Sequence, residues 1–172
     1  MPEATGLTFI IGGARSGKSA HAERLIAELP PPWTYIATAQ AFDDEMRERI
    51  ALHRGRREPG WTTLDAPLEL PQAIDSAANG SSPVLVDCLT LWLTNIMLAE
   101  RDIPAETAAL HAALEWAKAP VVLVSNEVGL GIVPDNALAR RFRDEAGRLH
   151  QQLAVRADRV LFMVGGLPLT VK

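Results

Sequence analysis

The chain has 172 residues, which suits one compact domain over residues 1–172 and is too short for two ordinary ones. Its net charge of −4 argues against a nucleic-acid-binding surface, which usually carries a basic excess. No stretch approaches the roughly 20 apolar residues that a membrane span requires, and residues 1–7 lack the apolar core of a signal peptide. We therefore expect a cytoplasmic protein with no membrane span and no nucleic-acid partner.

The single cysteine, Cys88, lies in an apolar run. One cysteine excludes an internal disulfide framework and fits a reducing compartment. We interpret Cys88 as a small core residue rather than as a reactive thiol.

Short apolar segments alternate with segments of helical spacing along the chain. In chain order we expect a strand at 7–11, a helix at 18–29, a strand at 33–37, a helix at 43–53, a short strand at 61–64, a helix at 68–78, a strand at 84–87, helices at 91–100 and 104–118, a strand at 121–125, a long helix at 136–156, and strands at 160–164 and 169–171. Strands that are continuous apolar runs and alternate with helices indicate an α/β fold, with a mostly parallel sheet covered by helices on both faces. In such sheets ligands bind beyond the carboxyl ends of the strands.

A phosphate-binding loop follows the first expected strand and leads into the first expected helix. The sequence matches the pattern G-x-x-x-x-G-K-[ST] of nucleoside triphosphate-binding proteins. The glycines permit a backbone that turns successive N–H groups toward one anion, and the helix adds the positive end of its dipole. The matching residues are Gly12, Gly13, Ala14, Arg15, Ser16, Gly17, Lys18 and Ser19.

Such a site needs a Mg2+ ion, and the metal is usually held by a hydroxyl of the loop and by an acid at the end of a neighbouring strand. Ser19 and Asp87 are the residues that we expect to hold it. The alternative for Asp87 is a turn acid or a cap of the helix that follows.

His53 stands apart from the other histidines because Arg54, Arg56 and Arg57 follow it. Guanidinium groups bind phosphate oxygens, and their charge lowers the pKa of an imidazole, which keeps it nucleophilic. The competing interpretation is that these cations stabilise the C-terminal end of a helix through its dipole. For His21, packing and a place in the site explain the sequence equally well, whereas His111 and His150 are expected to be structural or surface residues.

Several blocks together strongly resemble one enzyme family from residue 8 to residue 172. Besides the phosphate loop, they are Tyr35-Ile36-Ala37-Thr38-Ala39, Asp44-Glu45-Met46 with Arg49-Ile50 and His53, Asp87-Cys88-Leu89-Thr90, and Asn126-Glu127-Val128-Gly129-Leu130-Gly131-Ile132-Val133-Pro134. The family is the bifunctional adenosylcobinamide kinase/adenosylcobinamide-phosphate guanylyltransferase of cobalamin biosynthesis.

The resemblance implies two reactions. ATP or GTP phosphorylates adenosylcobinamide, and GMP is then transferred from GTP to the phosphate through a guanylyl-histidine, which would be His53. It also implies a homo-oligomer, commonly a trimer, and apolar surface on the helices at 91–98 and 43–52 is available for subunit contacts. The nucleotide would be held by the phosphate loop together with Ala37, Thr38, Ala39, Arg54, Gly55, Arg56, Arg57, Asp65 and Asp87.

Glu127 follows the strand at 121–125 and therefore lies at the ligand edge. It either orients the corrinoid hydroxyl or binds Mg2+, or it is a solvated acid in a turn. Arg140, Arg141 and Arg143 begin the long helix and are interpreted mainly as a solvated face. Two other functions remain open from the residues alone, namely a simple P-loop kinase of a small alcohol or nucleotide and a nucleotide-dependent switch.

Overall fold

The computed structural model describes residues 6–40, 44–55 and 59–172; for Glu45, Met46, Arg49, Leu52, His53 and Arg54 it describes the backbone alone. Its elements in chain order are β1 (Leu7–Gly12), α1 (Lys18–Ala27), β2 (Trp33–Ala37), α2 (Asp44–Gly55), β3 (Trp61–Asp65), α3 (Leu70–Ala78), β4 (Val84–Asp87), α4 (Leu89–Leu98), α5 (Ile103–Trp116), β5 (Val121–Asn126), α6 (Ala137–Arg156), β6 (Arg159–Val164) and β7 (Leu167–Thr170). All these elements were expected from the sequence, and their ends differ from expectation by a few residues.

The strands form one sheet in the order β3-β2-β4-β5-β1-β6-β7. Every neighbouring pair is parallel except β6 and β7, which form an antiparallel hairpin at one edge. This confirms the mostly parallel sheet. Because β1, β4 and β5 lie in its centre, their carboxyl ends meet at one edge, which is where the phosphate loop begins.

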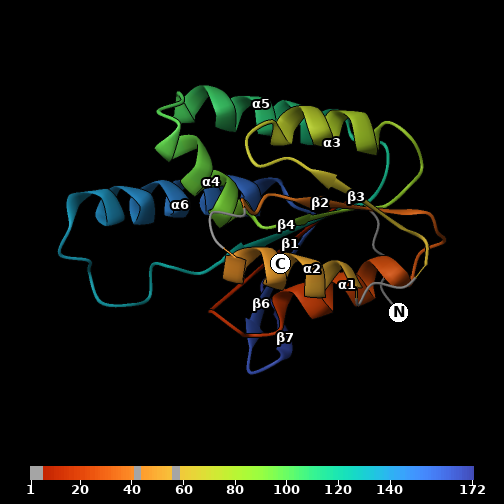
Figure 1. Ribbon diagram of the computed structural model, residues 1–172, viewed down its shortest axis with the longest axis horizontal. Helices are drawn as coiled ribbons and strands as arrows, with labels where there is room; N and C mark the ends of the chain where they lie inside the picture. The colour runs from red at the N-terminus through yellow and green to blue at the C-terminus, as the bar shows by residue number, and fades with distance from the viewer. Residues whose placement is uncertain (1–5, 41–43, 56–58) are drawn as a thin grey trace.

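Helices cover both faces of the sheet (Figure 1). On one face, α3, α4, α5 and α6 pack on side chains such as Phe9, Val86 and Leu123, and on the other face α1 packs on Ile10 and Val124. Successive side chains of the central strands thus point to opposite faces of the sheet, and each face has its own hydrophobic core. This explains why these strands are continuous apolar runs in the sequence.

The helix α4 contributes most of its apolar side chains to the core. Trp92, Leu93 and Ile96 are buried, whereas Leu91 and Leu98 are exposed. Of the apolar surface expected on the helix at 91–98, the large side chains that are exposed are these two.

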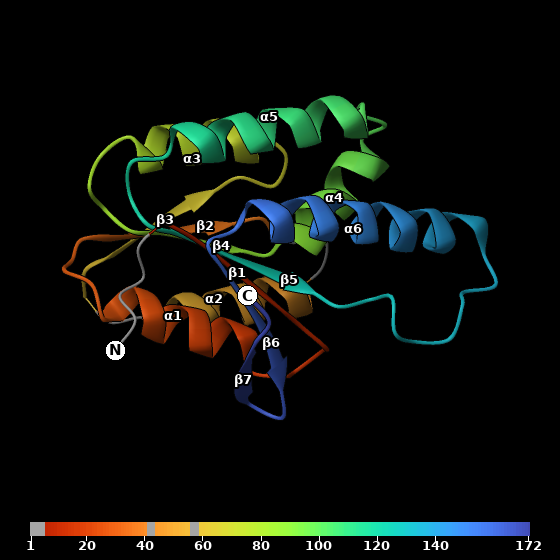
Figure 2. The ribbon, with the colours of Figure 1, turned by 180° about the vertical axis from the view of Figure 1, so that it is seen from behind.

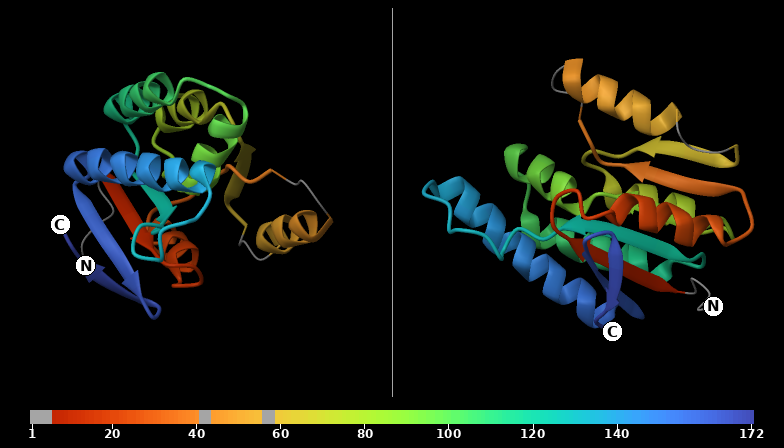
Figure 3. Two further views of the ribbon diagram at one scale, coloured as in Figure 1. Left: turned by 90° about the vertical axis from the view of Figure 1, so that its left-hand side faces the viewer. Right: turned by 90° about the horizontal axis from the view of Figure 1, so that it is seen from below.

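The helix α2 stands at the β3 edge of the sheet, at the opposite side from the β6–β7 hairpin (Figure 3). It connects the carboxyl end of β2 to the amino end of the parallel strand β3. Consequently α2 begins at the edge that carries the phosphate loop and ends toward the opposite edge (Figure 1).

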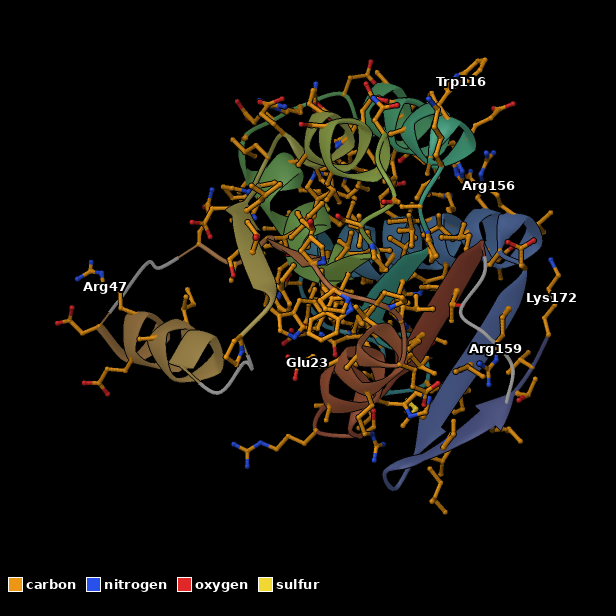
Figure 4. The ribbon with its side chains drawn as sticks, turned by 90° about the vertical axis from the view of Figure 1, so that its right-hand side faces the viewer. Glu23, Arg47, Trp116, Arg156, Arg159 and Lys172 are labelled. Carbon is orange, nitrogen blue, oxygen red and sulfur yellow. The ribbon has the colours of Figure 1, made fainter. Side chains whose placement is uncertain are left out.

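Trp116 projects into solvent at the end of α5, and Lys172 lies beside the last turn of α6 (Figure 4). The amino group of Lys172 donates to the carbonyl oxygens of Ala154 and Val155, which fixes the chain end against that helix. No helix in the described ranges has the length and apolar character needed to cross a membrane.

Candidate nucleotide site

The phosphate loop leaves β1 at Gly12 and enters α1 at Lys18. Gly17 precedes the helix with φ 90° and ψ 11°, a left-handed conformation that favours glycine, and no described side chain caps the helix there. The first N–H groups of an uncapped helix lack partners within the helix, and a bound phosphate satisfies them. The local geometry therefore fits the phosphate group that the sequence predicts.

Lys18 lies inside this loop, with its side chain almost fully buried. Its Nζ donates to the carbonyl oxygen of Gly13 at 2.5 Å and lies 3.4 Å from Ser16 Oγ. Burial lowers the pKa of Lys18 below its ordinary value, while the negative charge of Asp87 acts in the opposite direction. The ammonium group is therefore held over the loop by its contacts with Gly13 and Ser16.

The β6–β7 hairpin supports the loop from behind, a feature that the sequence motif does not reveal. The N–H of Gly166 donates to the carbonyl oxygen of Ser16 at 3.1 Å. A Cβ atom at Gly12 would lie 2.8 Å from the carbonyl oxygen of Met163, and one at Gly17 would lie 3.3 Å from the Cα of Gly166. The left-handed backbone thus favours glycine at position 17, and the close contact with the hairpin favours glycine at both positions.

We expect Gly12→Ala to lower the free energy of unfolding by about 1–3 kcal/mol, because the added methyl group would press on the backbone of β6. Gly13→Ala is the matched control, since no heavy atom lies within 4 Å of a Cβ at that position. Urea unfolding of both variants provides the measurement. Equal losses of stability in the two variants would show that contact between the added methyl group and the hairpin is not the cause of the loss.

Asp87 is held at the end of β4 by Tyr35, whose hydroxyl donates to Asp87 Oδ2 at 2.8 Å. The residue that caps α4 is Cys88, and no described side chain makes a capping hydrogen bond there. The interpretation of Asp87 as a helix cap is therefore not supported. Two strand spacings separate β4 from β1, about 10 Å, so that Asp87 faces the loop from the side.

A buried polar network ties the strand ends together beneath the site. The hydroxyl of Thr38 donates to the carbonyl oxygen of Cys88 at 2.7 Å and accepts from the N–H of Cys88 at 2.9 Å. Asn126, which pairs in register with Gly12, donates from Nδ2 to Thr90 Oγ1 at 3.1 Å. The hydroxyl of Thr38 is thus engaged in holding β2 and β4 together, and Asn126, to which the sequence analysis gave no role in the site, lies at the site edge.

Cys88 is buried, and burial is the main reason that the pKa of its thiol is raised. Its Sγ lies 3.2 Å from Thr90 Oγ1. These observations agree with the interpretation of Cys88 as a packed core residue, because a reactive thiol requires a lowered pKa.

The remaining predicted site residues lie at increasing distance from the loop. Ala37, Thr38 and Ala39 are at the carboxyl end of β2, and Asp65 is at that of β3, four strand spacings or about 19 Å from β1. They share with the phosphate loop the edge formed by the carboxyl ends of the strands.

The structure does not bring His53 to this edge. His53, Arg54 and Gly55 belong to the last turn of α2, which points toward the opposite edge, and the side chains of His53 and Arg54 are not described. Arg56 and Arg57 lie outside the described residues.

His150 is a buried histidine whose role is structural. Its Nε2 lies 2.7 Å from Ser125 Oγ, and its ring packs on Phe9 with 5.6 Å between the ring centroids. Burial lowers its pKa below the ordinary value of 6.5, while the charge of Glu127 opposes the shift. The folded protein therefore favours the neutral imidazole, in agreement with the structural role expected for this residue.

This pKa shift predicts a pH dependence of stability. Below about pH 6.5 the unfolded chain binds a proton that the folded chain resists, so the free energy of unfolding falls by at most about 1.4 kcal/mol per pH unit. We expect His150→Gln to remove this component in urea unfolding between pH 7.5 and 5. His111→Gln, in an exposed contact with Gln152 on the same helix layer, is the control. An unchanged pH slope in His150→Gln would contradict the assignment.

The sheet order, the loop and the acid at the end of β4 define the class: this is a P-loop protein of the α/β type. The family model described as cobinamide kinase / cobinamide phosphate guanyltransferase matches residues 8–171. The chain belongs to that family. It is accordingly a transferase of cobalamin biosynthesis.

Relatives match over nearly their whole length. The bifunctional adenosylcobalamin biosynthesis protein CobP of Pseudomonas aeruginosa is 52% identical, over 95% of this chain and 96% of the relative. The bifunctional adenosylcobalamin biosynthesis proteins CobU of Salmonella typhimurium and Escherichia coli are each 42% identical, over 96% of this chain and 99% of the relative.

Solved structures resemble the fold at much lower identity. The flagellar accessory protein FlaH from Methanocaldococcus jannaschii has a TM-score of 0.57 at 13% identity, covering 100% of this chain and 80% of its own. An ATPase of a type III secretion system has a TM-score of 0.53 at 12% identity, covering 92% of this chain and 51% of its own. These neighbours establish the P-loop fold alone.

Proposed function

We propose that this chain catalyses both reactions of its family at one nucleotide site centred on the phosphate loop. The observation that carries the proposal is the buried Lys18, held over an uncapped helix start by Gly13 and Ser16. In the kinase reaction the hydroxyl oxygen of adenosylcobinamide attacks the γ-phosphorus of ATP or GTP. The bond to the bridging oxygen breaks, the nucleoside diphosphate leaves and the hydroxyl proton is released. Lys18 and the loop N–H groups stabilise the charge on the transferred group.

Ser19 and Asp87 are the residues proposed to hold Mg2+ together with the phosphates. Ser19 is the second residue of α1, and Asp87 has one oxygen engaged by Tyr35. Hydroxyl and carboxylate oxygens are the ligands that Mg2+ prefers, and Mg2+ keeps most of its remaining positions for water and phosphate. When bound, the ion would neutralise charge on the phosphate oxygens.

In the transferase reaction a nitrogen of His53 is proposed to bond to the α-phosphorus of GTP while pyrophosphate leaves. The phosphate oxygen of the corrinoid then attacks the same phosphorus, the P–N bond breaks and the histidine is regenerated. Arg54, Gly55, Arg56 and Arg57 are proposed to contact the nucleotide during this reaction. With α2 oriented as in the structure, the reaction requires either a change in the orientation of α2 or a phosphate loop from a second subunit.

Ala37, Thr38 and Ala39 are proposed to line the nucleotide beyond the phosphates, and Asp65 to reach its base end. Support comes from their common edge and from the distance of about 19 Å between β3 and β1, which exceeds the reach of the phosphates alone. The hydroxyl of Thr38 is paired with Cys88, its N–H donates to the carbonyl oxygen of Asp87, and its carbonyl oxygen accepts from Asn95. Its part in the lining is therefore proposed to be the positioning of Ala37 and Ala39.

The experiment that tests the function uses adenosylcobinamide and two nucleotides with different labels. Label in the γ-phosphate of ATP is expected to enter the corrinoid first, and label in the α-phosphate of GTP is expected to enter it afterwards. Incorporation of the γ-label alone would reduce the proposal to a kinase. Hydrolysis of nucleotide without transfer of either label would favour a switch.

We also propose a homo-oligomer, and specifically the trimer that the family resemblance implies. The support is the edge strand β7, which pairs only with β6 in the sheet of the described residues and exposes Leu167 and Leu169. A monomeric mass in light scattering would reject this proposal. The cytoplasmic location expected from the sequence stays a prediction.

A further inference from the structure

The loop between β5 and α6 presents aliphatic side chains to solvent. We call residues 127–138 the apolar arm. Relative exposures are 82% for Leu130, 98% for Ile132, 60% for Val133 and 55% for Leu138 in the first turn of α6. The arm extends beyond the end of the sheet on the side of the phosphate loop (Figure 2).

Polar side chains hold the arm in this shape. Glu127 Oε1 accepts from the N–H groups of Gly129 and Leu130. From α6, Arg143 donates to the carbonyl oxygen of Gly129, and Arg140 donates to those of Pro134 and Asp135. Glu127 and both arginines are thus engaged with the loop backbone.

This arrangement reverses the usual distribution of side chains, because the polar groups fix the backbone and the apolar groups face water. Burial of one aliphatic side chain contributes about 1.5–3 kcal/mol, and folding alone leaves that contribution unused at four positions of the arm. Apolar groups that gather on a protein surface mark interaction sites. The arm is therefore built to contact another molecule.

The arm starts at the phosphate loop itself. The N–H of Glu127 donates to the carbonyl oxygen of Gly12 at 2.8 Å, and Asn126 pairs in register with Gly12. A molecule on the arm therefore lies at the same edge of the sheet as the phosphate loop. This continuity with the nucleotide site favours a substrate over an unrelated partner.

The acceptor of the proposed kinase reaction has the matching chemistry. Only its hydroxyl has to reach the phosphate, while its corrin ring, a bulky macrocycle rich in methyl groups, stays outside the loop. We propose that the apolar arm binds the corrin ring through Leu130, Ile132 and Val133 and thereby selects a corrinoid over a small alcohol. This inference rests on the proposed function, because it takes the corrinoid as the acceptor.

Equilibrium dialysis of cobinamide, followed by its own visible absorbance, tests the arm without requiring turnover. The double variant Leu130→Ser/Ile132→Ser is expected to bind cobinamide about tenfold more weakly than the wild type. Its dissociation constant for GTP and its mass in light scattering should stay unchanged. Val155→Ser is the matched control, since Val155 is 81% exposed on α6 outside the arm, and it should bind cobinamide like the wild type.

Unchanged cobinamide binding in the double variant would overturn the inference. A changed mass of the double variant in light scattering would assign the arm to a subunit contact, and this result would also overturn the inference. A different result would overturn the proposed function: the wild type would bind cobinamide in dialysis but transfer neither label to it. In that case weaker binding by the double variant would still support the arm as a corrinoid site.

Discussion

Replacing Lys18 by methionine is expected to lower kcat/KM for cobinamide phosphorylation by a factor of about 10² to 10³. Methionine keeps much of the length of the side chain but removes the donor that now reaches Gly13 and Ser16. Because that donor is also proposed to stabilise the transferred phosphate, both phosphoryl transfer and the binding of GTP should suffer. The loss of the γ-label in the corrinoid and the dissociation constant for GTP measure the two effects.

Lys118→Met is the matched control, because Lys118 follows α5, and its backbone N–H contacts Ala78 far from the phosphate loop. It should retain wild-type rates. Since Lys18 is buried, circular dichroism and urea unfolding of Lys18→Met should accompany the kinetics. A folded Lys18→Met variant with wild-type GTP affinity would reject the phosphate loop as the nucleotide site.

The sheet and the phosphate loop could be predicted because their signals are local. The strands at 84–87 and 121–125 are apolar runs that fit only a buried parallel sheet, and the glycine pattern before Lys18 specifies a backbone conformation. The place of Asp87 at the ligand edge follows from the same reasoning, because the end of a central parallel strand lies at that edge.

Other parts of the site depend on contacts between segments that are distant in the sequence. Nothing near Ser16 indicates that Gly166 will donate to its carbonyl oxygen. The pairing of Thr38 with Cys88 likewise depends on β2 and β4 becoming neighbours, although they are far apart in the chain. The residue types at 166 and 38 do not specify these partners, so sequence alone predicts neither contact.

The apolar character of a segment also failed to predict its surroundings. The helix at 89–98 and the loop at 130–133 are both apolar in sequence, yet the first is largely core and the second faces solvent. What separates them is position: α4 lies against the sheet, whereas the loop is held outward by Arg140 and Arg143. The spacing of apolar residues predicts the helix, but it does not predict that Arg140 and Arg143 will bind backbone carbonyl oxygens of the loop.

His53→Asn is expected to abolish covalent labelling of the protein by GTP that carries its label in the α-phosphate. The wild-type label should be labile in acid and stable in alkali, as a phosphoramidate of histidine is. Because the kinase reaction uses the phosphate loop rather than His53, transfer of the γ-label to cobinamide should persist in this variant. His111→Asn, in the exposed contact with Gln152, is the control and should be labelled like the wild type.

Label that survives in His53→Asn would move the nucleophile to another residue, and an unlabelled wild type would reject the guanylyl-histidine.

A mixing experiment then shows whether His53 attacks GTP in its own subunit or in a neighbouring one. The 12 residues of α2 span about 18 Å and carry His53 away from the edge where the phosphate loop lies. Lys18→Met retains His53, and His53→Asn retains the loop, so neither variant alone should be labelled. Label recovered when the two are mixed assigns the attack to neighbouring subunits, whereas its continued absence assigns the attack to a reoriented α2 within one chain.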